Sequence, residues 1–309
     1  MIPVRMKNHV IKAEKLTKYY GKTRGIENLD LTVEKGDFFG FIGPNGAGKS
    51  TCIRTLLGLI KPTGGSAQVL GHDIVSSHDE ILKSVGYLPS EINFYSGMKV
   101  RDVIRYSADL RGAECSAVAD TLAKRLDLDM DKKVDDLSLG NRKKVGIICA
   151  VQHRPELLIL DEPTSGLDPL MQKEFFSILR EQNENGATIF LSSHILSEVQ
   201  AHCRTAAFIK DGRIIISDRV EKLEETGARK VVLRGQLSDA FVSAIRAMTG
   251  TAVSDPVFDD SSASFLYNGD ISRLMALLAA EKLRDVSITE PTMEEIFLNY
   301  YERGQEARS

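Results

Sequence analysis

A glycine-rich segment that ends in a lysine and two hydroxyl side chains carries the clearest chemistry in this sequence. Its members are Gly43, Pro44, Asn45, Gly46, Ala47, Gly48, Lys49, Ser50 and Thr51. Glycines allow the backbone to fold around a phosphate chain, so that successive N–H groups and the start of the next helix point at negative charge. Lys49 would reach the β- and γ-phosphates, and the Ser50 hydroxyl would bind a bridging Mg2+. The segment therefore predicts a nucleotide site.

Two adjacent carboxylates, Asp161 and Glu162, form a second part of this candidate site. They follow an apolar run at residues 157–160, which is typical of a buried parallel strand whose carboxyl end meets a ligand. Asp161 would hold Mg2+ through water, and Glu162 would polarise the attacking water. An acidic pair after a strand is just as often the solvated start of a loop. The phosphate-binding segment earlier in the chain favours the catalytic interpretation.

His194 and Ser138 are two further candidates. His194 follows an expected strand at residues 187–192, one βαβ unit after the acidic pair, where the strand end would face the phosphates. A lone histidine at a strand end is more often structural. Ser138 precedes an amphipathic helical pattern and is expected to cap that helix. A basic helix start is also ordinary on any surface helix, so neither residue is decisive by itself.

The elements that must position these groups indicate an α/β fold. An apolar run at residues 38–42 predicts a buried strand directly before the phosphate-binding segment, and alternation within residues 9–35 predicts an antiparallel strand pair. Between about residues 87 and 150 the pattern is helical, with amphipathic stretches at 100–110 and 117–128. We expect a P-loop core with a mixed sheet, an antiparallel β subdomain and a helical subdomain.

The composition changes after Arg219, and no nucleotide motif follows. The patterns predict, in order, a strand at 230–233, a helix at 238–248, strands at 253–258 and 262–267, a helix at 271–283 and a strand at 285–289. The order β-α-β-β-α-β is that of a small α+β ferredoxin-like domain. A chain of 309 residues also exceeds what one core usually organises. We therefore expect a nucleotide-binding domain at 1–220 and an accessory domain at 221–309.

A possible contact helix lies near the C-terminus. Met293, Ile296, Phe297 and Tyr300 recur at helical spacing and would form one apolar stripe. Such a stripe either packs against its own domain or contacts another subunit, and the sequence leaves both possibilities open.

Bulk composition excludes several classes of protein. The net charge of -3 gives no basic field, so nucleic acid is not an expected partner. No signal-peptide core and no uninterrupted apolar run of about eighteen residues occurs, so we expect a cytosolic chain without a membrane span. The four cysteines are isolated from one another and indicate neither a zinc site nor a disulfide framework.

Taken in order, these motifs resemble those of the ATP-binding subunit of an ABC transporter over roughly residues 9–220. The resemblance implies ATP and Mg2+ as cofactors and an adenine-stacking role for Tyr20, with Tyr19 as a second candidate. It implies that residues 43–51 are Walker A, that Asp161 belongs to Walker B, and that Glu162 is the catalytic glutamate.

The same resemblance assigns roles to two further segments. Residues 165–168 resemble the D-loop, which places Asp168 among the nucleotide-contacting residues, and His194 resembles the switch histidine that senses the γ-phosphate. Lys49, Glu162 and His194 are then the catalytic side chains.

Residues 137–141 resemble the signature segment, which in the family contacts the nucleotide held by the other subunit. The family usually has L-S-G-G-Q, whereas this chain has L-S-L-G-N. Ser138 and Gly140, which offer a hydroxyl and a backbone N–H to the γ-phosphate in the family, are retained. The resemblance thus implies a homodimer with two ATP molecules between Walker A of one copy and the signature of the other.

A second departure concerns coupling to the membrane. After residues 87–89 the family usually has a glutamine that links Mg2+ and water to the transmembrane partner, and here Ser90 and Glu91 follow. Ser90 is too short to replace the glutamine directly. Glu91 has comparable reach and is a candidate Mg2+ ligand. Alternatively, Glu91 is a solvated loop residue and the segment couples through its backbone.

The C-terminal extension resembles that of ABC-2 type exporters. The resemblance implies an ATP-hydrolysing subunit bound to a transmembrane permease on a separate chain, at the inner face of the cell membrane. A soluble ABC ATPase of translation or DNA repair is the alternative, although such members carry two nucleotide domains or a long coiled coil, and neither occurs here. A regulatory module that barely hydrolyses ATP is disfavoured by the complete set of Asp161, Glu162 and His194.

Overall fold

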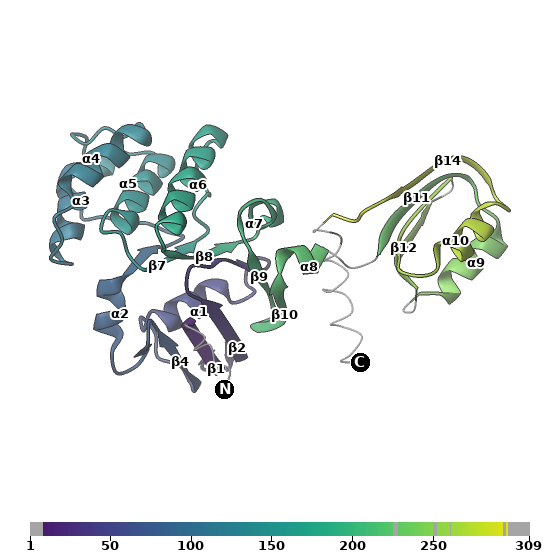
Figure 1. The fold of residues 1–309 in the computed structure, drawn as a ribbon, viewed down its shortest axis with the longest axis horizontal. Coiled ribbons are helices and arrows are strands. Elements are labelled where there is room, and N and C mark those ends of the chain that lie inside the picture. The colour runs from purple at the N-terminus through teal and green to yellow at the C-terminus, as the bar shows by residue number, and fades with distance from the viewer. Residues whose placement is uncertain (1–8, 225–227, 250–251, 260, 293–294, 296–309) are drawn as a thin grey trace, which may run out of the picture. The chain divides into compact units, whose positions relative to one another are not determined.

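The chain divides into two compact units, residues 1–219 and 220–309 (Figure 1). The computed structural model describes residues 9–224, 228–249, 252–259, 261–292 and 295. The expected apolar stripe of Met293, Ile296, Phe297 and Tyr300 lies outside the described residues.

A six-stranded sheet forms the core of the first unit, in the order β10-β9-β3-β8-β7-β6. Its strands are β3 (Phe38–Ile42), β6 (Val85–Leu88), β7 (Leu157–Asp161), β8 (Thr188–Ser193), β9 (Thr205–Lys210) and β10 (Arg213–Arg219). All neighbours pair in parallel except β10, which is antiparallel to β9. Every residue of β3, β7 and β8 is buried, as in strands covered on both faces. The expected mixed sheet is confirmed.

The parallel strands of this sheet bring the predicted chemistry to one edge. The phosphate-binding segment follows β3, the acidic pair lies at the end of β7, and His194 follows β8. Because β3 and β7 both pair with β8, all three strand ends are neighbours.

A four-stranded antiparallel sheet, in the order β2-β1-β4-β5, forms the second layer of this unit. It consists of β1 (His9–Tyr20), β2 (Thr23–Glu34), β4 (Gly64–Val69) and β5 (His72–Asp73). The strand pair expected within residues 9–35 is confirmed, and β2 alternates as expected, with Leu29, Leu31 and Val33 buried. Helix α1 (Lys49–Leu56) contributes Cys52, Ile53 and Leu56 to the same core.

The helical subdomain groups α3, α4 and α5 together (Figure 1). The helices of this unit after α1 are α2 (His78–Ser84), α3 (Val100–Asp109), α4 (Ser116–Arg125), the 3-10 turn η1 (Val134–Asp136), α5 (Leu139–Val151), α6 (Pro169–Glu184) and α7 (Leu196–His202). Two expected boundaries are wrong. The subdomain begins after Leu88, because Tyr87 and Leu88 belong to β6. The expected helix at 117–128 ends at Arg125, because Asp127 takes a left-handed backbone with φ 48° that stops the helix.

The second unit holds its own antiparallel sheet, in the order β12-β13-β11-β14. Its elements are α8 (Val220–Glu224), β11 (Arg229–Gln236), α9 (Asp239–Ala247), β12 (Val253–Asp259), β13 (Ser262–Tyr267), α10 (Ile271–Leu278) and β14 (Lys282–Thr289). From β11 onward they follow the expected β-α-β-β-α-β order. The expected helix end at residue 283 is wrong, because Lys282 and Leu283 pair with β11 and start β14.

Helices α9 and α10 cover one face of this second sheet (Figure 1). Phe241 and Ile245 of α9 and Leu274 of α10 pack with Val231 and Phe265 of the sheet in a separate buried cluster. The second unit therefore has a hydrophobic core of its own. In the described parts of both units, no helix has the length and apolar character needed to cross a membrane.

Candidate functional site

The phosphate-binding segment forms a closed loop between β3 and α1. Lys49 is the first residue of α1, and its side chain is only 6% exposed. Its Nζ donates to the carbonyl oxygens of Gly43 at 2.6 Å and Pro44 at 3.2 Å, which ties the loop to the helix start. Gly48 has φ 106°, and a Cβ there would lie 2.5 Å from the carbonyl oxygen of Gly25. Only glycine fits this position, so the loop retains a backbone cradle suited to an anion.

Asp161 and Glu162 lie at the carboxyl edge of the sheet. Asp161 is fully buried, and its Oδ1 accepts a 3.0 Å hydrogen bond from Oγ of Ser192 on β8. Its Oδ2 has no hydrogen-bond partner among the described residues. Because buried carboxylate oxygens are normally satisfied, this free oxygen fits a residue that binds a cation or its water.

The backbone of Glu162 turns sharply after β7. Its φ of 49° lies in the left-handed region, which is uncommon for residues other than glycine. The turn is held by its N–H, which donates to the carbonyl oxygen of Ser192 at 3.1 Å. Such backbone strain clusters at functional sites.

The Glu162 carboxylate bridges Lys49 and His194. Its Oε1 lies 3.1 Å from Nζ of Lys49, and its Oε2 lies 2.7 Å from Nδ1 of His194. The Glu162 side chain is 16% exposed, whereas His194 is 47% exposed and can meet a ligand. Three residues from separate segments thus meet. The arrangement places a carboxylate that can act as a base, with a histidine partner, beside the glycine-rich loop.

A cavity of about 440 Å³ contains most of the predicted nucleotide-binding residues. It is lined by Tyr20, Thr23, Arg24, Gly25, Asn45, Gly46, Gly48, Lys49, Ser50, Thr51, Ser90 and Glu162. The ring of Tyr20 is half exposed, with Nζ of Lys18 at 5.2 Å from the ring centroid. An exposed aromatic ring at the rim of a phosphate cavity is suited to stacking on a base.

Sequence reasoning missed Thr23 and Arg24 in this cavity. Both lie at the start of β2, directly after the turn that follows Tyr20. Arg24 also forms a 3.4 Å ion pair with Asp211. The sequence could have indicated them, because they follow Tyr20 by only a few residues and a tight turn brings its two ends close in space.

Ser138, Gly140 and Asp168 do not line this cavity. Ser138 caps α5 as expected, since its Oγ accepts from the N–H of Asn141 at 3.3 Å. Asp168 caps α6 by accepting from the N–H of Met171 at 3.0 Å. The two helix starts are close, because a Cβ on Gly140 would lie 2.7 Å from the carbonyl oxygen of Gly166. These residues form a separate surface of the same chain.

The segment after β6 contributes Ser90 rather than Glu91 to the cavity. Ser90 is among the lining residues, whereas Glu91 is exposed and is not one of them. The structure therefore does not bring Glu91 to the phosphate loop, and its role as a Mg2+ ligand stays a prediction. Within the described residues, no group of three or more His, Cys, Asp or Glu could hold a metal ion. A cation at Ser50 and Asp161 would need further oxygen ligands, such as phosphate.

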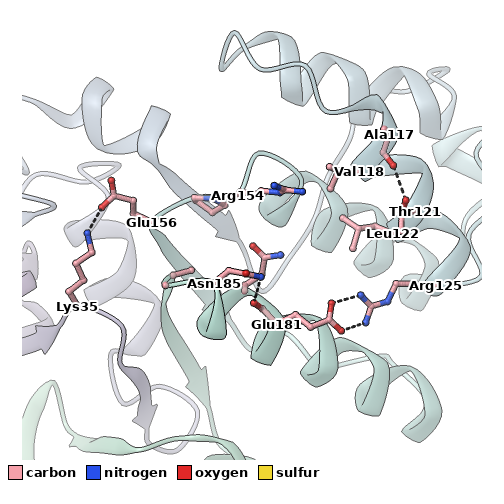
Figure 2. Close-up of a pocket in the computed structure, with 14 residues that line it drawn as sticks. Lys35, Ala117, Val118, Thr121, Leu122, Arg125, Arg154, Glu156, Glu181 and Asn185 are labelled. Atoms are coloured by element: carbon pink, nitrogen blue, oxygen red, sulfur yellow. Dashed lines mark hydrogen bonds and ion pairs between the residues drawn. The ribbon is translucent and has the colours of Figure 1, made fainter.

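A larger cavity of about 910 Å³ lies between α4, α6 and the start of β7, away from the phosphate loop. Figure 2 shows two ion pairs among its charged groups, Arg125 with Glu181 at 2.6 Å and Lys35 with Glu156 at 3.2 Å, while Arg154 has no interaction drawn there. None of the predicted nucleotide-binding residues lines it. The smaller cavity, which contains the phosphate-binding segment, is therefore the candidate active site.

Comparison with known proteins agrees with this geometry. A family model described as ABC transporter matches residues 26–165. The bacitracin transport ATP-binding protein BcrA of Bacillus licheniformis is 37% identical over 233 residues, which cover 74% of this chain and 76% of BcrA. The protein of the same name from Enterococcus faecalis is 30% identical over 298 residues, covering 94% of this chain and 95% of that protein. A solved ATP-binding subunit of an ABC transporter matches with a TM-score of 0.67 and 27% identity, covering 70% of this chain and 92% of that chain.

Proposed function

This chain belongs to the ABC transporter family as an ATP-binding subunit that hydrolyses ATP, and we propose that it powers export of an antibiotic or similar drug through a separate permease. The observation that carries the hydrolytic role is the contact of Glu162 with both Lys49 and His194 above the phosphate loop. The names of the two bacitracin transport relatives support the substrate class.

Mg2+ is proposed as the second cofactor, held by Ser50 and Asp161 together with the phosphates of ATP. The free buried Oδ2 of Asp161 supports this assignment, as does the placement of Ser50 at the start of α1 inside the cavity. When bound, the ion would offset the charge of the phosphates.

The side chains of the site have separate proposed roles in binding and hydrolysis. Tyr20 would stack on the adenine, and the loop N–H groups and Lys49 would bind the phosphates. Once the phosphates draw Lys49 away, Glu162 is left to accept a proton from the attacking water. His194 would hold the other oxygen of Glu162 in the required orientation.

A second copy of the chain is proposed to complete the site. Ser138, Gly140 and Asp168 lie together on a surface outside the cavity of their own chain, and the neighbouring Leu139 is 65% exposed. If they contact ATP, they do so on another subunit, which is the homodimer that the resemblance implies.

The second unit is proposed to be ferredoxin-like and to stabilise or regulate this dimer. Two findings support the fold. The elements follow the order β-α-β-β-α-β, and the strands of the unit lie side by side in the sheet in the order second, third, first, fourth. Its separate core supports an independent role.

The test of the proposed function is ATP-dependent drug uptake into everted membrane vesicles that contain the chain and its permease. Uptake should require ATP and should be lost with Glu162→Gln. The subunit should also co-purify with an integral-membrane protein from native membranes, which would support a permease partner. Co-purification of ribosomes or DNA would instead support the soluble ATPase alternative and overturn the export proposal.

A further inference from the structure

Lys143 of α5 is almost completely buried, with 2% of its surface exposed. Lysine is rarely buried unless partners satisfy its ammonium group. Here Nζ donates to the carbonyl oxygen of Ser90 at 3.1 Å and is 3.4 Å from that of Pro89. The lysine is therefore turned toward the segment that follows β6, which lines the nucleotide cavity through Ser90.

The charge of Lys143 also acts on the acidic pair. Burial lowers the pKa of Lys143, while attraction to Asp161 and Glu162 opposes that shift. Inside the protein this attraction is screened less than it would be between exposed groups.

Lys143 connects two parts of the site. Its helix is capped by Ser138, in the signature segment, and its Nζ contacts the backbone of Ser90, which lines the cavity. Ser90 stands where the resemblance implies a glutamine, and its side chain is shorter. Lys143, on the signature helix, instead contacts the backbone of this segment.

We propose that Lys143 is a positioning residue that couples the signature helix to hydrolysis. It holds residues 89–90 through their carbonyl oxygens. A shift of α5 would then move Ser90 and change the shape of the cavity wall. This inference rests on the proposed function as an ATP-hydrolysing subunit.

Three variants of the full chain separate the contribution of the Lys143 hydrogen-bond donor from that of its charge. Lys143→Met removes both donor and charge, Lys143→Gln restores a donor without charge, and Lys143→Arg retains both. Lys144→Met is the matched control. Lys144 is the next residue and is also buried, but its Nζ donates to the carbonyl oxygen of Asp127, at 3.5 Å, within the helical subdomain.

The first measurement is steady-state hydrolysis together with equilibrium ATP affinity. We expect Lys143→Met to lower kcat at least about tenfold with KM and affinity changed less than about threefold, the scale of losing hydrogen bonds from a charged donor. Lys143→Arg should restore most of kcat, and Lys143→Gln should fall between. Unchanged kcat in Lys143→Met, or an equal loss in Lys144→Met, would overturn the proposal.

The second measurement is hydrogen exchange without nucleotide over the peptide at residues 87–93. Exchange there should rise in Lys143→Met and stay at the wild-type level in Lys144→Met. If the wild-type chain itself failed to hydrolyse ATP, the proposed function would fall. The exchange result would still decide whether Lys143 holds this segment, because it does not depend on turnover. Equal exchange in wild type and Lys143→Met would contradict the inference.

Discussion

Nζ of Lys49 lies 3.1 Å from Oε1 of Glu162, so the lysine of the phosphate loop and the carboxylate after β7 form an ion pair. Both side chains are mostly buried, at 6% and 16% exposure. Breaking such a pair without a replacement is costly, because a charge would be left uncompensated. We expect the phosphates of ATP to replace Glu162 as the partner of Lys49, so that nucleotide binding releases the Glu162 carboxylate.

Glu162→Gln should retain ATP binding and lose turnover by on the order of 10^2 to 10^4, the scale for removing a positioned general base. ATP should then trap a dimer. Phosphate release and size-exclusion chromatography with Mg-ATP measure the two effects, and Glu156→Gln, an exposed surface acid, serves as the control. Near-normal hydrolysis would remove Glu162 from the mechanism.

Lys49→Ala should weaken ATP binding at least about tenfold, because it removes the fixed charge opposite the phosphates. Lys49→Arg should retain part of the affinity, since it keeps the charge but not the shape. Lys35→Ala is a control, because Lys35 pairs with Glu156 at the surface. Calorimetric titration with ATP gives the affinities. Wild-type affinity in Lys49→Ala would show that the lysine is not a phosphate ligand.

His194→Ala should lower kcat by about tenfold to a hundredfold, the range for losing a hydrogen bond to a charged group. The reason is that Oε2 of Glu162 loses its contact with Nδ1 at 2.7 Å. His78→Ala, on the exposed surface of α2, should have wild-type kcat. Steady-state hydrolysis provides the comparison, and an unaffected His194→Ala variant would assign the orientation of Glu162 to other residues.

Acidification should destabilise the chain partly through His153. Burial, with a smaller contribution from Arg111, lowers the pKa of His153 to about 4. An unfolded histidine titrates near pH 6.5, so between about pH 6.5 and 4 the unfolded state binds the extra proton and the free energy of unfolding falls as the pH falls. The loss should total about 1 to 2 kcal/mol, because partial solvent access screens the shift.

Urea unfolding at pH 7.5, 5.5 and 4.5 tests this effect. His153→Gln should lose less stability than the wild type across that range, while the exposed His78→Gln should follow the wild type. Equal pH dependence in all three proteins would show that His153 is not a source of acid sensitivity.

A fragment ending at Arg219 should fold and hydrolyse ATP, because the first unit is compact and holds its own core. If the second unit stabilises the dimer, the fragment should need a higher protein concentration for the same turnover per molecule. Thermal unfolding and ATPase activity across a dilution series test both points. Identical concentration dependence in the fragment and the full chain would leave the second unit without a role in assembly.

Contiguous features of the sequence determined the nucleotide core. The glycine pattern at residues 43–51 and the apolar runs at 38–42 and 157–160 encode a loop and two buried strands through local backbone freedom and burial. Family resemblance then linked these parts to His194 and to the signature segment. The sequence did not determine where the helix expected at 271–283 ends. That helix stops earlier because Lys282 pairs with β11, which is remote in sequence.

Only the tertiary structure decided which side chains meet. The ion pair of Lys49 with Glu162 depends on the parallel order of β3, β8 and β7, which places the ends of distant segments at one edge. The same folding turned Ser90 rather than Glu91 toward the cavity and buried Lys143 against the carbonyl oxygens of residues 89 and 90. Composition and periodicity locate a residue on an element, but its burial and electrostatic partners come from whichever other elements pack against it.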